Sequence, residues 1–160
     1  LYKEFVKKNP PHNITIMKRT WPAICMEKKH FKELEYVMNH SKHYSLVQGK
    51  TKMDKLMMSF FGSMGEHTKF GAKNCAKECD YLVFNDVIAK IFLPQLLKKR
   101  LGDFYKKNDS LEDKNNLKEL YDIAYNTIGE TRLEITRDQK QADEIIQKTL
   151  KYHEKHGGEK

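Results

Sequence analysis

TKMDKLMMSFFGSM, residues 51–64, is the most regular stretch of this sequence, and the fold expected for the whole chain follows from it. Its apolar side chains return every three or four positions, and Gly62 and Gly65 close the pattern. That spacing places them on one face of an α-helix, whereas a half-buried strand would alternate apolar and polar residues. The stretch therefore predicts an amphipathic helix with the apolar residues Met53, Leu56, Met57, Phe60, Phe61 and Met64.

The same helical spacing recurs on both sides of this stretch. It predicts further helices over about residues 20–40, 72–105, 110–128 and 142–153, and Pro94 should kink the longest of them. Residues 41–50 and 65–71 are expected to be loops, and residues 131–139 hold two competing helix-start signals. The run 13–16 alternates, and it is either extended or the approach to the next helix.

This pattern predicts an all-α fold. We expect a single domain of about five to six helices, packed as an antiparallel bundle or an irregular helical array. A length of 160 residues is sufficient for one domain with a substantial core. Within it, residues 1–12 should form an N-terminal arm ending near Pro10 and Pro11, residues 13–156 the helical core, and residues 157–160 a flexible C-terminus.

Three sequence features bear on the cellular compartment of the protein. No apolar run reaches the length of a membrane span, and the absence of an initial Met or a signal-peptide pattern suggests a processed protein or a piece of a larger one. An odd count of three cysteines favours an intracellular, reducing compartment. Glycosylation sequons at Asn13, Asn39 and Asn108 leave a secreted origin open.

Charge is unevenly distributed along the chain. The formal net charge is +8, but residues 1–108 hold 21 Lys and Arg against 10 Asp and Glu, whereas residues 109–160 hold 9 against 12. This asymmetry is consistent either with acidic helices that pack near basic ones or with a basic surface that binds an acidic partner.

Candidate metal ligands have simpler explanations. Cys75 and Cys79 share a helical face, but both fall on the apolar stripe, where a thiol packs as a small hydrophobic group. The pairs His40 with His43 and His153 with His156 lie at predicted helix ends, where a cation is stabilised by the helix dipole. We therefore expect neither a metal nor a cofactor.

A basic segment between residues 98 and 107 is the strongest candidate for binding a polyanion. Its positive charges are interleaved with Phe104 and Tyr105, and basic residues with aromatic ones can hold phosphates and stack on bases. The alternative is that the aromatic residues face the core and the cations form a solvated helix face. The candidate residues are Lys98, Lys99, Arg100, Lys106 and Lys107.

Flexible thioether side chains make residues 53–64 a candidate surface for a protein partner, although such a stripe also suits a core. The candidates there are Met53, Met57, Met58, Phe61 and Met64.

No phosphate-binding glycine-rich loop, nucleophile elbow or thiolate–histidine motif is present in the sequence, so we expect no enzyme. The sequence favours a non-enzymatic helical interaction domain that binds a protein partner. One alternative is a basic domain that binds nucleic acid or another polyanion, with an anionic membrane surface as a weaker variant. The other is a secreted helical protein that acts as a ligand. The oligomeric state is open.

Overall fold

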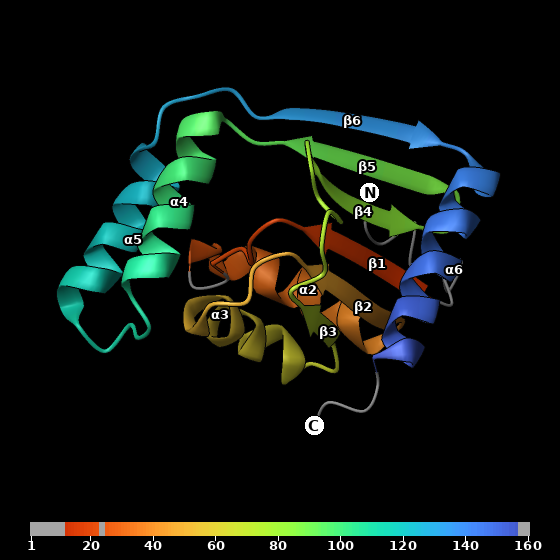
Figure 1. Ribbon diagram of the computed structural model, residues 1–160, viewed down its shortest axis with the longest axis horizontal. Helices are drawn as coiled ribbons and strands as arrows, with labels where there is room; N and C mark the ends of the chain where they lie inside the picture. The colour runs from red at the N-terminus through yellow and green to blue at the C-terminus, as the bar shows by residue number, and fades with distance from the viewer. Residues whose placement is uncertain (1–11, 23–24, 157–160) are drawn as a thin grey trace.

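The computed structural model describes residues 12–22 and 25–156, in which six strands form one sheet and five helices pack around it (Figure 1). The order of strands across the sheet is β3-β2-β1-β4-β5-β6. The strands are β1 (His12–Met17), β2 (Lys42–Val47), β3 (His67–Phe70), β4 (Asp80–Phe84), β5 (Val87–Phe92) and β6 (Arg132–Arg137). The helices are α2 (Lys28–Asn39), α3 (Lys52–Gly62), α4 (Gln95–Lys107), α5 (Lys114–Asn126) and α6 (Gln139–Lys155).

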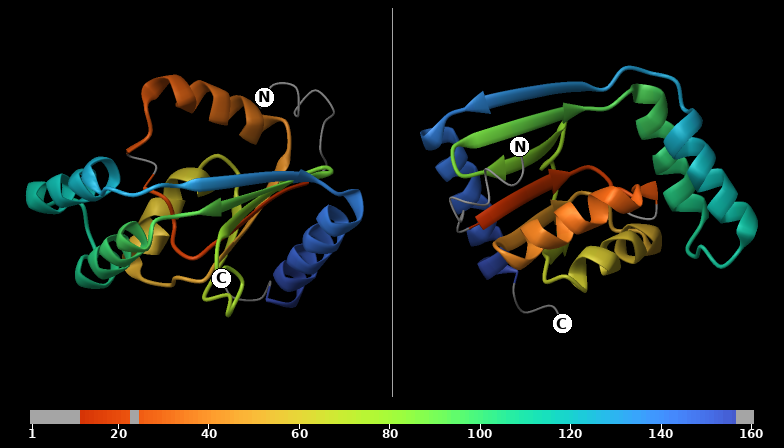
Figure 2. Two further views of the ribbon diagram at one scale, coloured as in Figure 1. Left: turned by 90° about the horizontal axis from the view of Figure 1, so that it is seen from above. Right: turned by 180° about the vertical axis from the view of Figure 1, so that it is seen from behind.

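The sheet is mixed, and its strand direction changes beside the central strand β1. β1 pairs in parallel with β2, and β2 with β3, while β1 pairs antiparallel with β4 on its other side. β4, β5 and β6 continue as an antiparallel meander. Helices α2 and α3, which connect the parallel strands, lie on one face of the sheet, and α6 covers the opposite face (Figure 2). The protein is therefore an α/β fold with helices on both faces.

Alternation along the strands builds a separate core on each face of the sheet. Ile14, Val83 and Ile88 are fully buried and pack under Ala142 and Ile146 of α6. On the opposite face, Met17 and Val47 pack against Met58 of α3.

Helices α4 and α5 form a hairpin that stands beside the sheet rather than on it (Figure 1). They reach the rest of the protein through α3, whose Met53 and Met57 enter a third core cluster. This cluster places α4 next to the end of β1. Its other buried members are Leu101, Phe104, Tyr105, Leu120 and Ile123.

The all-α prediction is wrong, and so are the five- to six-helix bundle or array and the long helix kinked at Pro94. Residues 80–92 form the hairpin β4–β5, turning at Asn85, whose φ is 51°. No residue of this hairpin is exposed, because both faces are at least partly covered, so its apolar run lacks strict alternation and matches helical spacing by coincidence. Pro94 is instead the N-cap of α4, where its missing N–H disrupts no helical hydrogen bond.

Three further strands were expected to be loops or helix starts. β2 lies in the predicted loop 41–50, β3 in the predicted loop 65–71, and β6 in the region of competing capping signals. Each of them depends on pairing with neighbours that are distant in sequence. The alternating run 13–16 is extended and forms most of β1.

Several predicted helices are present with shifted boundaries. α3 begins after Thr51, whose hydroxyl accepts a hydrogen bond from the Asp54 N–H in a capping box. The helix expected from Thr20 begins only at Lys28. Residues 1–11 of the predicted arm, Ile24 and the predicted flexible end 157–160 lie outside the described residues. Within the described ranges, no helix has the length and apolar character needed to cross a membrane.

Candidate anion-binding cleft

A basic cleft lies where β1 ends, between the segment that precedes β4 and the exposed side of α4. Its volume is about 340 Å³. Three acidic residues, Glu78, Asp80 and Asp103, also line it. Cations come to it from three separate parts of the chain: Lys18, Arg19, Lys77, Lys98, Lys99 and Lys106.

Asp80, the first residue of β4, holds the segment that follows β1 in place. Its Oδ1 accepts a hydrogen bond from the backbone N–H of Lys18 at 2.9 Å, and its Oδ2 accepts one from the indole N–H of Trp21 at 3.3 Å. Burial raises the pKa of the Asp80 carboxyl, while these two hydrogen bonds and the nearby Lys98 and Lys18 charges act in the opposite direction. Trp21 therefore has a fixed position at the cleft wall.

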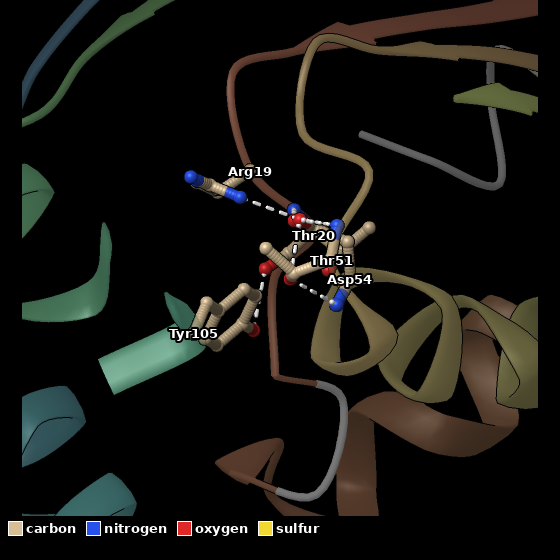
Figure 3. A network of polar contacts seen from close by, with 5 residues as sticks. All are labelled: Arg19, Thr20, Thr51, Asp54 and Tyr105. Carbon is tan, nitrogen blue, oxygen red and sulfur yellow. Dashed lines mark hydrogen bonds and ion pairs between the residues drawn. The ribbon is translucent and has the colours of Figure 1, made fainter. Parts of the chain in front are cut away.

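Asp54 anchors Arg19 at the base of the same segment (Figure 3). The Asp54 carboxylate is fully buried, and its Oδ2 lies 2.6 Å from Nη1 of Arg19. The same oxygen accepts hydrogen bonds from the backbone N–H of Thr51 at 3.0 Å and from its hydroxyl at 2.7 Å. Breaking a buried ion pair of this kind leaves an uncompensated charge, so the arrangement is costly to disrupt.

Tyr105 extends this network to α4. Its hydroxyl donates to the carbonyl of Thr20 at 2.7 Å, and the backbone N–H of Thr20 points to Oδ1 of Asp54 at 3.4 Å (Figure 3). Burial raises the pKa of the Tyr105 hydroxyl. The end of β1, the start of α3 and the middle of α4 are thus held together below the cleft.

The five candidate polyanion-binding residues divide between two sides of α4. Lys98, Lys99 and Lys106 line the cleft; Nζ of Lys98 donates to the carbonyl of Glu78 at 3.1 Å, and Lys99 pairs with Asp103 at 3.1 Å. Arg100 and Lys107 are directed toward α5.

Those two residues make contacts with α5 and the segment after it. Arg100 contacts Asp122 at 2.6 Å and the hydroxyl of Thr127 at 2.9 Å, and Lys107 lies 3.8 Å from Glu119. Positions 98, 99 and 106 share a helical side because 3.6 residues complete one turn, and positions 100 and 107 share another.

The cleft geometry can be set against known proteins. No family model, curated protein or solved structure matches the chain. What the cleft binds must therefore be inferred from the chemistry of its own residues.

The candidate partner-binding residues lie mostly in the interior. Met53, Met57 and Met58 are buried, and Phe61 and Met64 are half-buried. The exposed apolar residues of α3 are instead Leu56 and Phe60, which line a shallow groove shared with Phe31 of α2. Met53, Met57 and Met58 therefore pack in the core, whereas Phe61 and Met64 remain partly accessible.

The candidate metal ligands are dispersed. Cys79 is buried and Cys75 half-buried, both are free thiols, and burial raises the pKa of Cys75 to about 11. Nδ1 of His40 lies 2.6 Å from the carbonyl of Tyr36, and Nε2 of His153 lies 3.2 Å from that of Ser45. No group of three or more ligating side chains suited to a metal occurs in the part of the chain that the structure describes.

Sequence reasoning did not assign a role to Lys18, Arg19, Trp21, Asp54 or Asp80. The only available signal was the basic pair Lys18-Arg19 directly after the alternating run 13–16. Polar residues that follow a buried parallel strand lie at the edge of the sheet where α/β proteins bind ligands. That rule could be applied only once β1 was recognised as a strand.

Proposed function

We propose that this protein binds a phosphate-bearing polyanion, specifically single-stranded nucleic acid, through the basic cleft. The observation that carries the proposal is the convergence of six cationic side chains from three separate segments on one cavity. Phosphate contacts from Lys and Arg supply most of the affinity for nucleic acids. The sequence favoured a protein partner, but the cleft supports the polyanion alternative more directly.

Three of the six cations of the cleft, Lys18, Lys77 and Lys106, are available for a ligand, because Arg19, Lys98 and Lys99 are engaged by Asp54, the Glu78 carbonyl and Asp103. Asp80 is engaged by Lys18 N–H and Trp21, and Asp103 pairs with Lys99. The side chains of Lys18, Lys77 and Lys106 are exposed, so their ammonium groups can move to meet phosphates. Arg19 is committed to Asp54, which neutralises its charge, so it orders the segment after β1 rather than contacting phosphate.

Trp21 provides an aromatic surface on which a base can stack, the second feature that binding of a single strand requires. It lies at the cleft wall, half-buried, with its indole N–H directed at Asp80. Stacking of a base on an aromatic ring contributes about 1–3 kcal/mol and tolerates any base. A cavity of about 340 Å³ suits one nucleotide unit, while the exposed lysines can contact adjacent phosphates.

The proposal is tested with a fluorescently labelled 12-nucleotide single strand, using anisotropy and the fluorescence of Trp21, the only tryptophan. The test variant combines Lys18→Glu, Lys77→Glu and Lys106→Glu, which reverse the charge of the three exposed cations of the cleft. The control combines Lys140→Glu, Lys148→Glu and Lys151→Glu, all exposed on α6, with the same change in net charge.

We expect the parent protein to bind with a change in Trp21 fluorescence and a steep salt dependence. Each phosphate contact on a single strand contributes about 0.7 to the logarithmic salt slope, so three lost contacts should reduce the slope by about 2. The control should retain most of the parent slope. Equal binding by the two variants would contradict the proposal, as would binding without any response of Trp21.

A mononucleotide is the second arm of the experiment. Binding of the strand but not the mononucleotide supports a site that contacts several phosphates at once. Tight, stoichiometric binding of the mononucleotide alone would replace nucleic acid with a small phosphorylated ligand.

A further inference from the structure

The outer edge of β6 differs from the opposite edge of the sheet. β3 at the far edge has four residues, and its Lys69 donates a hydrogen bond to the carbonyl of His156 after α6. β6 has six residues, all exposed, and no strand of the described residues pairs with its outer side (Figure 1). Exposed edges are usually shortened, charged or covered because they pair with other chains.

The pairing of β6 with β5 determines which backbone N–H and C=O groups of β6 point to its outer side. The N–H of Asp138 donates to the carbonyl of Asp86 at 2.8 Å, and Val87 is paired with Arg137. In an antiparallel ladder, hydrogen-bonded pairs alternate with non-bonded ones. Residues 132, 134 and 136 therefore bond to β5, and the N–H and C=O groups of Leu133 and Ile135 point away from it.

The same two residues carry apolar side chains that solvent reaches. Leu133 is 56% exposed and Ile135 is 52% exposed. They are paired with Ile91 and Ala89 of β5, which places the four residues on one face of the sheet. Two branched aliphatic residues on an unpaired edge, with no proline or lysine in the strand, favour association rather than solubility.

We propose that β6 pairs antiparallel with β6 of a second copy of this chain, joining the two sheets into one. Only residues whose backbone N–H and C=O groups point outward can form hydrogen-bonded pairs between the two copies. This requirement limits the registers in which a two-fold axis can relate the two β6 strands. A register centred on Glu134 would place two carboxylates opposite each other and is disfavoured. A register centred on Ile135 would place Leu133 opposite Arg137 and Glu134 opposite Thr136, so it forms no pair of opposite charges within β6. A register centred on Leu133 places Arg132 of each copy opposite Glu134 of the other, with Leu133 against Leu133.

In this register Arg132 and Glu134 face opposite charges across the two strands, and Leu133 faces an apolar residue. Arg132 already lies 3.3 Å from Glu134 within the strand and 4.1 Å from the centre of the Phe92 ring, so its guanidinium is held beside the edge. Opposite charges and apolar pairs directly across an antiparallel ladder are both stabilising. An isologous contact of this kind closes after two copies and does not propagate.

The first test measures the oligomeric state of the full chain by sedimentation velocity over a wide concentration range. Ile135→Pro removes an N–H that points outward, so it deletes an intermolecular bond without deleting a bond to β5. Leu133→Lys with Ile135→Lys tests the side chains. Tyr36→Lys with Leu56→Lys is the control, because both residues are exposed and apolar on α2 and α3.

We expect a dimer in the parent and the control, and a dissociation constant raised at least about tenfold in both β6 variants. Unchanged Trp21 fluorescence and helix content would show that the variants remain folded. A parent that is monomeric at every concentration would overturn the proposal. A dimer that the β6 variants do not weaken would overturn it as well.

The second test examines the register by cross-linking. In the register centred on Leu133, Leu133→Cys faces its own copy at a separation that a disulfide can span, whereas Ile135→Cys faces residue 131. Mild oxidation should cross-link Leu133→Cys above the level of the parent, which has three free thiols, and leave Ile135→Cys at that level. Preferential cross-linking of Ile135→Cys would overturn this register.

Discussion

The contact between Gly49 and Asp54 illustrates how single residues shape the cleft. A Cβ atom at position 49 would lie 2.4 Å from Oδ2 of Asp54, which is far inside van der Waals contact. The Asp54 carboxylate cannot withdraw, because Arg19 and Thr51 hold it from other directions. Glycine at this position therefore makes room for the buried ion pair that fixes the end of β1.

We predict that Gly49→Ala lowers the free energy of unfolding by about 2 kcal/mol or more, because the added methyl group displaces a buried, paired carboxylate. Gly62→Ala is the matched control. It lies at the end of α3, where no atom of the described residues comes within 4 Å of the added Cβ, so it should be neutral or stabilise by about 0.5–1 kcal/mol. Urea unfolding followed by Trp21 fluorescence measures both. Equal effects of the two substitutions would show that the Asp54 network is not rigid.

At the scale of elements, α6 acts as the cover of one sheet face. Its Ala142 and Ile146 are buried against Ile14, Val83 and Ile88, which come from three strands. A helix of 17 residues with one apolar side obtains most of its stability from such packing rather than from its own propensity. The face below α6 would otherwise expose the centre of the sheet to water.

We predict that Ile146→Ala destabilises the protein by about 2–4 kcal/mol, since it removes buried methyl groups and leaves a cavity under α6. Ile128→Ala is the same chemical change at a residue that is 88% exposed, and it should change stability by less than about 0.5 kcal/mol. Thermal unfolding monitored by circular dichroism distinguishes them. A small effect of Ile146→Ala would mean that α6 does not seal this core.

At the scale of the whole molecule, three histidines flank the sheet where β1 and β2 begin: His43 is buried near the end of α2, and His12 and His153 are half-buried around Tyr44 on the other face. Burial lowers the pKa of His12, His43 and His153, and nearby Lys42 and Lys69 lower those of His12 and His153 further. Tyr44 lies between His12 and His153, with ring centroids 5.6 and 5.2 Å away. The folded protein therefore favours the neutral form of all three rings.

This arrangement predicts a loss of stability in mild acid. Because the pKa of each histidine is lower in the folded state, its contribution is complete above the unfolded value of about 6.5 and is lost as the pH falls below it. His43→Gln should flatten the dependence of unfolding free energy on pH between about 7 and 5. His30, exposed on α2, provides the control substitution His30→Gln. A parallel pH profile for parent and His43→Gln would contradict the assignment.

Several elements could be read from the amino-acid sequence alone because their signals are local. The helix over residues 51–64 was predictable since its cap, Thr51, and its apolar stripe lie within one segment. The 3.6-residue period also made α5 and α6 predictable, although α5 begins after Asp113 rather than near Ser110 and the start of α6 after Asp138 was not predicted. The cationic segment 98–107 was likewise identified as a candidate site, because charge is visible in composition.

The tertiary structure alone determined the sheet and the cleft. β2 is buried through pairing with β1 and β3 and lacks strict alternation. β6 alternates Leu133 and Ile135 with polar residues, but it is exposed on both faces and overlaps the competing helix-start signals. The split of the cationic segment into Lys98, Lys99 and Lys106 on one side and Arg100 and Lys107 on the other required Asp122 and Glu119 of α5 to be in place. Strand pairing and charge convergence join residues that are distant in sequence. A local pattern cannot encode them, because the free energy that stabilises them arises only when the chain closes on itself.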